Sequence, residues 1–167
     1  QRALPIILRG PDGRARSAAA HHSQSIETIF MHVPGIKVAI PSTPADVYGL
    51  YKTALTQSDP VIFFEQKLLY VLKGDVPEEE TYIPFGVADV KRSGTNVTLV
   101  ATGRMVHESL RAAATLADAD GIQCEVLDLR TLVPWDKEAV LTSVRKTGRL
   151  STVHETWRRA GCGCCTP

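Results

Sequence analysis

The sequence predicts an α/β protein, in which a unit built on a parallel sheet is followed by a second alternation of strands and helices. Two observations support this prediction. An amphipathic helix at 44–55 lies between two strand-like apolar runs, and an acidic segment at 73–81 separates this unit from further strand and helix patterns.

The helix after Thr43 has the clearest local pattern. Thr43 can cap its start, Pro44 suits the first position because its missing N–H costs nothing there, and Asp46 is placed favourably in the first turn. The strand at 61–64 has four consecutive apolar residues, as expected for a strand buried on both faces, and implies a right-handed parallel crossover. The apolar residues that recur at helical spacing are Val47, Leu50, Tyr51, Ala54 and Leu55.

Shorter patterns fill the rest of the first half. The sequence predicts a strand at 5–8, a turn at 10–13, a loop to His22, a helix at 23–32 and a strand at 36–40.

The second half again alternates strands and helices. Strands at 87–91 and 97–101 flank a turn-rich segment and predict a hairpin. A helical stripe ended by Gly121, a strand at 124–129, a helix at 136–145 ended near Gly148 and a strand at 150–153 follow. We therefore expect one domain over 1–74, an acidic linker at 75–81, and a second domain over 82–167.

Composition excludes several classes of function. Lys and Arg total 19 against 18 for Asp and Glu, so no charge excess points to nucleic acid as a partner. No apolar run reaches the ~20 residues of a membrane span, and no secretory signal is visible, so we expect a reducing intracellular compartment. The first residue is Gln1, and both ends look truncated. A zinc site at Cys162, Cys164 and Cys165 is disfavoured because no second ligand pair at finger spacing accompanies them.

Two adjacent histidines provide the most interesting candidate site. His21 and His22 lie in a loop before the helix predicted at 23–32, where an imidazole could donate a proton to developing negative charge. The alternative is that both are surface loop residues. Glu65, Lys67 and Tyr70 follow a strand of the predicted parallel sheet, where a structural ion pair is the simpler interpretation.

The motifs around these residues resemble a known family. Arg9-Gly10-Pro11-Asp12-Gly13 followed by His22-Ser23-Gln24 is similar to the R-G-P-[ND]-G and Q-H-S-Q signatures of beta subunits of thiamine-diphosphate-dependent 2-oxo acid dehydrogenases. Further segments resemble the family in the same order along the chain, from Val33-Pro34-Gly35 to Val153-His154-Glu155.

The resemblance implies the later part of a pyrimidine-binding domain and the start of a transketolase-type carboxy-terminal domain. It also implies an oxidoreductase acting on 2-oxo acids, with thiamine diphosphate shared with an alpha subunit that holds magnesium. The partners would be that alpha subunit, in an α2β2 heterotetramer, and a lipoyl-bearing acyltransferase core. The glutamate that activates the cofactor would lie upstream of residue 1, so the isolated chain is expected to be inactive. The location would be the cytoplasm, or the mitochondrial matrix in a eukaryote.

Site residues follow from the same resemblance. His22 corresponds to the His of the family motif, which assists acyl transfer to the lipoyl group, whereas His21 replaces the usual Gln. Gln57 stands where the family has Asp. The resemblance also implies a potassium site formed by oxygens of Ile6, Ala54, Leu55, Gln57 and Asp59.

The motifs leave the substrate open between pyruvate, branched-chain 2-oxo acids and acetoin. One alternative is another enzyme of the same cofactor superfamily, such as a transketolase or deoxyxylulose-phosphate synthase, although their D-G-P-T-H motif is absent from this loop. The other is a non-catalytic interface module.

Overall fold

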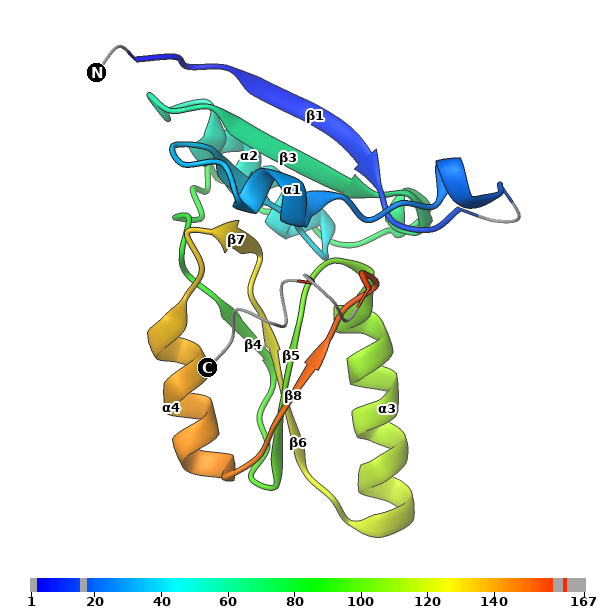
Figure 1. Ribbon diagram of the computed structural model, residues 1–167. Helices are drawn as coiled ribbons and strands as arrows, with labels where there is room; N and C mark the ends of the chain where they lie inside the picture. The colour runs from blue at the N-terminus through cyan, green and yellow to red at the C-terminus, as the bar shows by residue number, and fades with distance from the viewer. Residues whose placement is uncertain (1–2, 16–17, 158–160, 162–167) are drawn as a thin grey trace.

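Two four-stranded sheets, one above the other, form the framework of the molecule (Figure 1). The computed structural model describes residues 3–15, 18–157 and 161. The strand orders are β1-β3-β2-β7 and β4-β6-β5-β8, and helices pack against both sheets, so the predicted α/β class is confirmed.

Three neighbouring strands of the first sheet are parallel, namely β1 (Ile7–Asp12), β3 (Val61–Gln66) and β2 (Lys37–Ala39). Side chains alternate across it, because successive residues of a strand point to opposite faces. Val61 and Phe63 pack against the side of α2 (Pro44–Ala54), whereas Ile62 and Phe64 point to the opposite side, with Phe30 of α1 (Glu27–Met31). The predicted strand-helix-strand unit of β2, α2 and β3 is therefore confirmed.

Helix α2 begins as its sequence predicts. The Oγ1 of Thr43 accepts a hydrogen bond from the backbone N–H of Asp46 at 3.1 Å, and Pro44 occupies the first turn. This cap satisfies one of the free amides of the first turn, which otherwise have no partner inside the helix.

Strand β1 is longer than the predicted one, and the turn predicted at 10–13 is wrong. Pro11 and Asp12 still pair in register with Glu65 and Gln66 of β3. Proline is tolerated because β1 is an edge strand of its sheet. The chain turns only at Gly13, whose φ is +75°. Helix α1 is correspondingly shorter than the predicted helix at 23–32.

The predicted hairpin is also wrong. Strand β6 (Cys124–Asp128) lies between β4 (Asp89–Arg92) and β5 (Val97–Ala101), antiparallel to the first and parallel to the second. The connection crosses the start of β6 instead of turning back on β4. Gly94 permits this crossing, because a Cβ there would lie 2.2 Å from the backbone carbon of Cys124.

The other elements of the second half agree with the predictions. Helices α3 (Arg104–Asp120) and α4 (Lys137–Thr147) end at Gly121 and Gly148, which have φ values of +67° and +71°. This left-handed conformation is the usual glycine C-cap. The helices flank the lower sheet on opposite sides, and β8 (Leu150–Val153) forms its edge (Figure 1).

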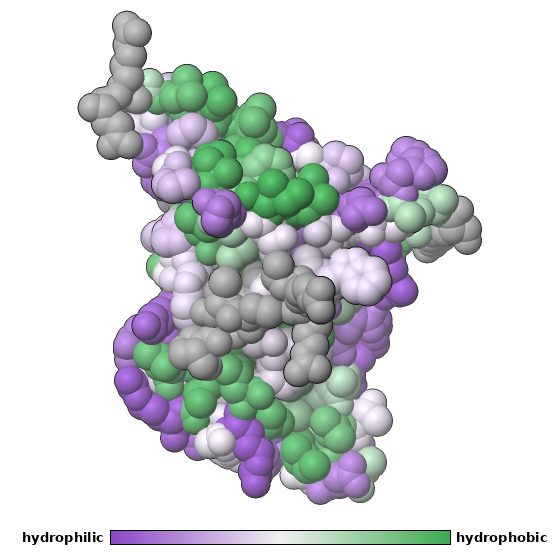
Figure 2. Space-filling view, in the orientation of Figure 1, coloured by the Kyte–Doolittle hydropathy of each residue, from purple (hydrophilic) through white to green (hydrophobic). Residues whose placement is uncertain are grey.

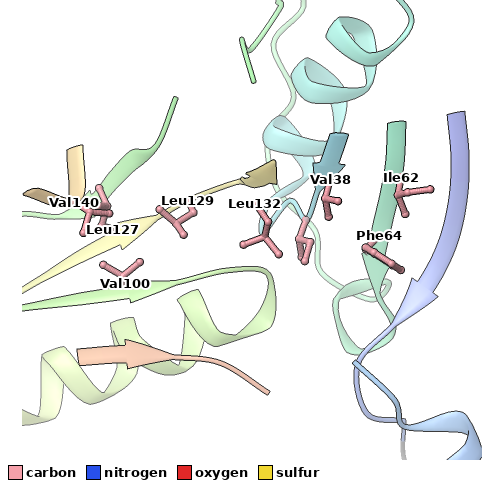
Figure 3. Close-up of a cluster of buried hydrophobic side chains, with 9 residues drawn as sticks. Val38, Ile62, Phe64, Val100, Leu127, Leu129, Leu132 and Val140 are labelled. Atoms are coloured by element: carbon pink, nitrogen blue, oxygen red, sulfur yellow. The ribbon is translucent and has the colours of Figure 1, made fainter. Parts of the chain in front are cut away.

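One strand joins the two halves. Strand β7 (Thr131–Val133) leaves the second half and pairs antiparallel with β2 in the first sheet, which the sequence did not predict. One apolar cluster extends from Val38 and Ile62 to Leu127 and Val140, so the halves share a core (Figure 3). The division of the chain at residues 75–81 stays a prediction.

Candidate functional site

The loop carrying His21 and His22 lies at the carboxyl end of strands β1 and β3. Both histidines are exposed, in a short 3₁₀ turn, η1 (Ala20–His22), and their ring centroids are 4.3 Å apart. Ligands of parallel α/β sheets usually bind at this edge. Helix α1 starts only at Glu27 and has five residues, so the interpretation of His22 as a residue at a helix start does not apply.

The two ends of this loop are tied together at its base. Buried Asp12 accepts a hydrogen bond from the backbone N–H of Ile26 at 3.2 Å and another from Nε2 of Gln66 at 2.9 Å. The N–H of Gly13 donates to the carbonyl of Gln24 at 3.0 Å. These bonds fix where the loop leaves and rejoins the body of the protein.

Asp12 lies in an unusual electrostatic environment. Burial, and after it the charge of Glu27, raise the pKa of Asp12 to about 6. Glu27 is itself 1% exposed, and its Oε1 lies 2.9 Å from Nε2 of His154 at the end of β8. The base of the loop therefore contains two buried carboxyl groups and an imidazole from the second half of the chain.

An open cleft of about 450 Å³ lies beside this cluster. Ser23, Ser25 and Met105 contribute to its wall, together with charged residues of both signs, namely Arg14, Arg104, Glu108 and Glu155. Arg104 bonds Glu155 at 3.0 Å, and it also pairs with Glu108. Most charged side chains of the cleft therefore form ion pairs with one another.

Glu65 forms a structural ion pair, as expected for this group of residues, but its partner comes from β1. It pairs with Arg9 of β1 at 2.5 Å and accepts a hydrogen bond from the hydroxyl of Tyr70 at 3.0 Å. Lys67 makes no ion pair with any residue that the structure describes. Burial and the bond to Glu65 raise the pKa of the Tyr70 phenol. A cleft of about 300 Å³ opens here, with Pro44 and Leu69 in its wall.

An ionic cluster that no sequence pattern predicted joins the two halves of the chain. Asp46 of α2 forms ion pairs with Lys91 of β4 at 2.9 Å and with Arg130 at 2.8 Å. Asp128 is fully buried and accepts a hydrogen bond from Ser42 at 2.5 Å. Burial raises the pKa of Asp128 to about 6. Scattered charged residues at 46, 91 and 130 give no local pattern, so no signal in the sequence pointed to this cluster.

The residues predicted to hold potassium lie around the chain segment between α2 and β3. The carbonyl of Ile6 accepts a hydrogen bond from Val61, and the carbonyl of Ala54 accepts one from Gln57. These oxygens, with Leu55 beside them, suit a cation chemically. However, the side chains of Gln57 and Asp59 already contact the ammonium group of Lys37, by a hydrogen bond and by an ion pair at 3.3 Å. A potassium ion would therefore compete with Lys37.

His107 contacts the carbonyl of Ser42 through Nε2 at 2.7 Å and so helps to join the two halves. Among the residues that the structure describes, no three His, Cys, Asp or Glu side chains are placed to hold a metal ion. Cys162, Cys164 and Cys165 lie outside those residues.

Fold and site together define a two-sheet α/β protein with an exposed histidine loop above a buried acidic cluster. Two family models match it: the transketolase pyrimidine binding domain over residues 1–73 and the transketolase C-terminal domain over residues 86–164. A solved split-gene transketolase, described as an inactive beta4 tetramer, superimposes with a TM-score of 0.82 at 26% identity, covering 98% of this chain and 52% of that one. A transketolase variant from Pichia stipitis shares the fold, with a TM-score of 0.64 at 17% identity over 91% of this chain and 23% of its own.

Curated relatives narrow the family. The chain is 51% identical to the beta subunit of acetoin:2,6-dichlorophenolindophenol oxidoreductase of Cupriavidus necator, covering 90% of this chain and 44% of the relative. It is 47% identical to the 2-oxoisovalerate dehydrogenase subunit beta of Bacillus subtilis, covering 90% of this chain and 46% of the relative. It is 46% identical to the pyruvate dehydrogenase E1 component subunit beta of the same organism, covering 94% of this chain and 48% of the relative.

The chain belongs to the transketolase-like family, and the curated relatives that it resembles are beta subunits of acetoin, 2-oxoisovalerate and pyruvate enzymes. It spans about half the length of the curated relatives that it matches. The family resemblance inferred from the motifs is confirmed.

Proposed function

We propose that the protein containing this chain is the beta subunit of a thiamine-diphosphate-dependent enzyme that decarboxylates a 2-oxo acid, or cleaves acetoin, and passes the acyl group to a lipoyl domain. The names of the relatives support this class of reaction, since they include acetoin, 2-oxoisovalerate and pyruvate enzymes. Their identities, between 46% and 51%, are too similar to choose one substrate.

The observation that carries the proposal is the position of His22. Its ring is exposed at the carboxyl edge of the parallel sheet, and it forms no hydrogen bond to any residue that the structure describes. An imidazole in such a place is free to bind or deliver a proton to a group that arrives from outside. These features fit a cofactor bound against this edge by a second subunit.

His22 is then the residue that holds and transfers the proton during acyl transfer. Thiamine diphosphate, when bound, supplies the electron sink that the loss of the carboxylate group requires. The chain contributes the loop, its tied base and the proton. We assign magnesium to the alpha subunit, and we propose potassium binding by oxygens of Ile6, Ala54, Leu55, Gln57 and Asp59 only in competition with Lys37.

An alpha subunit is the proposed partner, in an α2β2 assembly that docks on a lipoyl-bearing acyltransferase core. Figure 2 shows apolar side chains gathered in the upper part of the molecule, over β1 and α1. Leu8 and Ile29 belong to these elements and are 53% and 62% exposed. Apolar surface of this kind suits contact with protein. No described helix has the length and apolar character of a membrane span. We propose the cytoplasm, or the mitochondrial matrix in a eukaryote, as the location.

Reconstitution tests the proposed function. The full-length beta subunit would be combined with its alpha subunit, thiamine diphosphate and magnesium, and offered pyruvate, 2-oxoisovalerate and acetoin in turn. We expect carbon dioxide release from the 2-oxo acid, or acetaldehyde release from acetoin, and acylation of a lipoyl domain with one of the three. Turnover of sugar phosphates instead would identify a transketolase-type enzyme, and no turnover with any of them would favour an interface module.

A further inference from the structure

Glu27 connects the histidine loop to the second sheet. It is the first residue after the loop rejoins the body of the protein, at the start of α1, and it is 1% exposed. Its Oε1 lies 2.9 Å from Nε2 of His154, which follows the last strand of the other sheet. The contact spans the two halves of the chain directly beneath the loop.

The neighbours of His154 determine the direction of this hydrogen bond. The backbone N–H of Thr156 donates to Nδ1 of His154 at 3.1 Å, so Nδ1 must carry a lone pair. The hydroxyl of Thr156 lies 2.7 Å from the same nitrogen. The hydrogen of the neutral ring is therefore on Nε2 and is donated to the carboxylate of Glu27. Thr156 also fixes the plane of the ring, so His154 is a rigid donor.

The loop has few other constraints. Among the described residues between Gly13 and Glu27, none is buried, so packing does not hold the loop. Its ties are the bonds of Asp12 to Ile26 and of Gly13 to Gln24 at its base, a bond from the N–H of Ala15 to Ser23, and an exposed ion pair of Arg14 with Glu155 at 3.8 Å. Asp12 faces Glu27 across this base from β1, and the charge of Lys67 acts on Asp12 from η2 (Lys67–Leu69). The charge of Glu27 disfavours a second negative charge on Asp12, and the hydrogen bond from His154 stabilises the carboxylate of Glu27 in this buried position.

We propose that the Glu27–His154 hydrogen bond holds the histidine loop in a fixed position relative to the second sheet. Glu27 and His154 are then positioning residues for His22. The part of this inference that concerns catalysis rests on the proposed function of His22. The part that concerns the position of the loop does not. The bond makes the placement of the loop depend on the docking of the second half of the chain, which supplies His154 and Thr156.

The first test measures the loop itself by hydrogen–deuterium exchange, in the assembled complex of full-length subunits. Glu27→Ala should accelerate amide exchange in peptides covering residues 18–26 by at least about tenfold, because a hydrogen bond to a charged group is lost. Glu27→Gln should restore most of the protection, since its amide oxygen still accepts from His154. Glu125→Ala is the matched control, because Glu125 is also buried but bonds Ser143 and Lys146 far from the loop. Unchanged exchange in Glu27→Ala, or equal acceleration in Glu125→Ala, would overturn the proposal.

The second test separates the position of the loop from the role of His22. Lipoyl acylation should fall about tenfold in Glu27→Ala and recover in Glu27→Gln, whereas Glu27→Ala should cause no further fall when His22 is already Ala. An equal fall in both backgrounds would mean that Glu27 acts independently of His22, and would refute its role as a positioning residue. If loop exchange responds as expected but His22→Ala leaves acylation intact, the loop is positioned as proposed and the proposed function of His22 is wrong.

Discussion

The ammonium group of Lys37 lies 3.3 Å from Oδ2 of Asp59, within the set of residues from which the family resemblance implies a potassium site. The same ammonium hydrogen-bonds the side-chain oxygen of Gln57. A lysine side chain thus already supplies positive charge where a bound cation would sit.

We therefore expect potassium to have little effect on this subunit. Thermal unfolding of the assembled protein should occur at nearly the same temperature in potassium and in sodium buffers of equal ionic strength. Lys37→Met should make the midpoint rise with potassium concentration, because a ligand that binds only the folded state stabilises it. Lys52→Met, which removes a surface partner of Glu80, is the control and should not respond to potassium. A strong potassium dependence of the unaltered protein would show that Lys37 does not compete.

The two ion pairs that Asp46 forms with Lys91 and Arg130 should stabilise the packing of the two halves against each other. Asp46 is 2% exposed, and its removal leaves two cationic side chains, 15% and 14% exposed, without this partner. Asp46→Ala should lower the free energy of unfolding by about 2 kcal/mol, less than for a fully isolated buried pair, because both cations keep Asp89 as a partner. Chemical denaturation measures the change. Glu138→Ala, which breaks a surface pair with Arg145, should change stability by about 0.5 kcal/mol or less.

Asp128 should make the protein less stable as the pH rises through the acid range. Its folded pKa of about 6 lies above the ordinary value of 3.8, so the folded state binds the proton more tightly than the unfolded state. Its contribution to stability is complete below about pH 4 and is lost as the pH rises towards 6. Asp128→Asn should flatten the slope of unfolding free energy against pH in that window. Part of the slope should remain, because Asp12 has a pKa raised in the same direction.

A profile that is as steep in Asp128→Asn as in the unaltered protein would contradict this assignment. The slope, and not the absolute stability, is the quantity to compare. The asparagine amide can still accept from Ser42, but it cannot also accept from the backbone N–H of Arg130, as the second carboxylate oxygen does.

His22→Ala in the complete enzyme should impair catalysis and spare folding. The side chain is exposed, so the free energy of unfolding should change by no more than about 0.5 kcal/mol. The rate of lipoyl acylation should fall by about 10² to 10⁴-fold, the usual contribution of general acid–base assistance. Decarboxylation measured with an artificial electron acceptor should fall less, since that assay omits the lipoyl step.

His21→Ala is the control for this experiment, because His21 lies beside His22 in the same turn. It should be nearly silent. If His21→Ala loses activity and His22→Ala stays active, the catalytic role belongs to His21. If both variants stay active, the loop has only a structural role.

Sequence alone determined the elements whose signals are local. Thr43, Pro44 and Asp46 specify the start of α2, the apolar run at 61–64 specifies a strand buried on both faces, and Gly121 and Gly148 specify two helix ends. Each signal acts within one turn or one strand, so neighbouring residues suffice to define it. The motif around His22 likewise identified the family without the fold.

The pairing of the strands and the choice of ionic partners depend instead on contacts between distant parts of the chain. The antiparallel pairing of β4 with β6 and the insertion of β7 beside β2 depend on contacts between residues 30 or more positions apart. The same holds for Glu27 and His154, which meet because α1 and β8 both pack against the core that the two halves share. Buried polar groups must find partners wherever the packed chain offers them, so their choice of partner is settled by packing and leaves no periodic trace in the sequence.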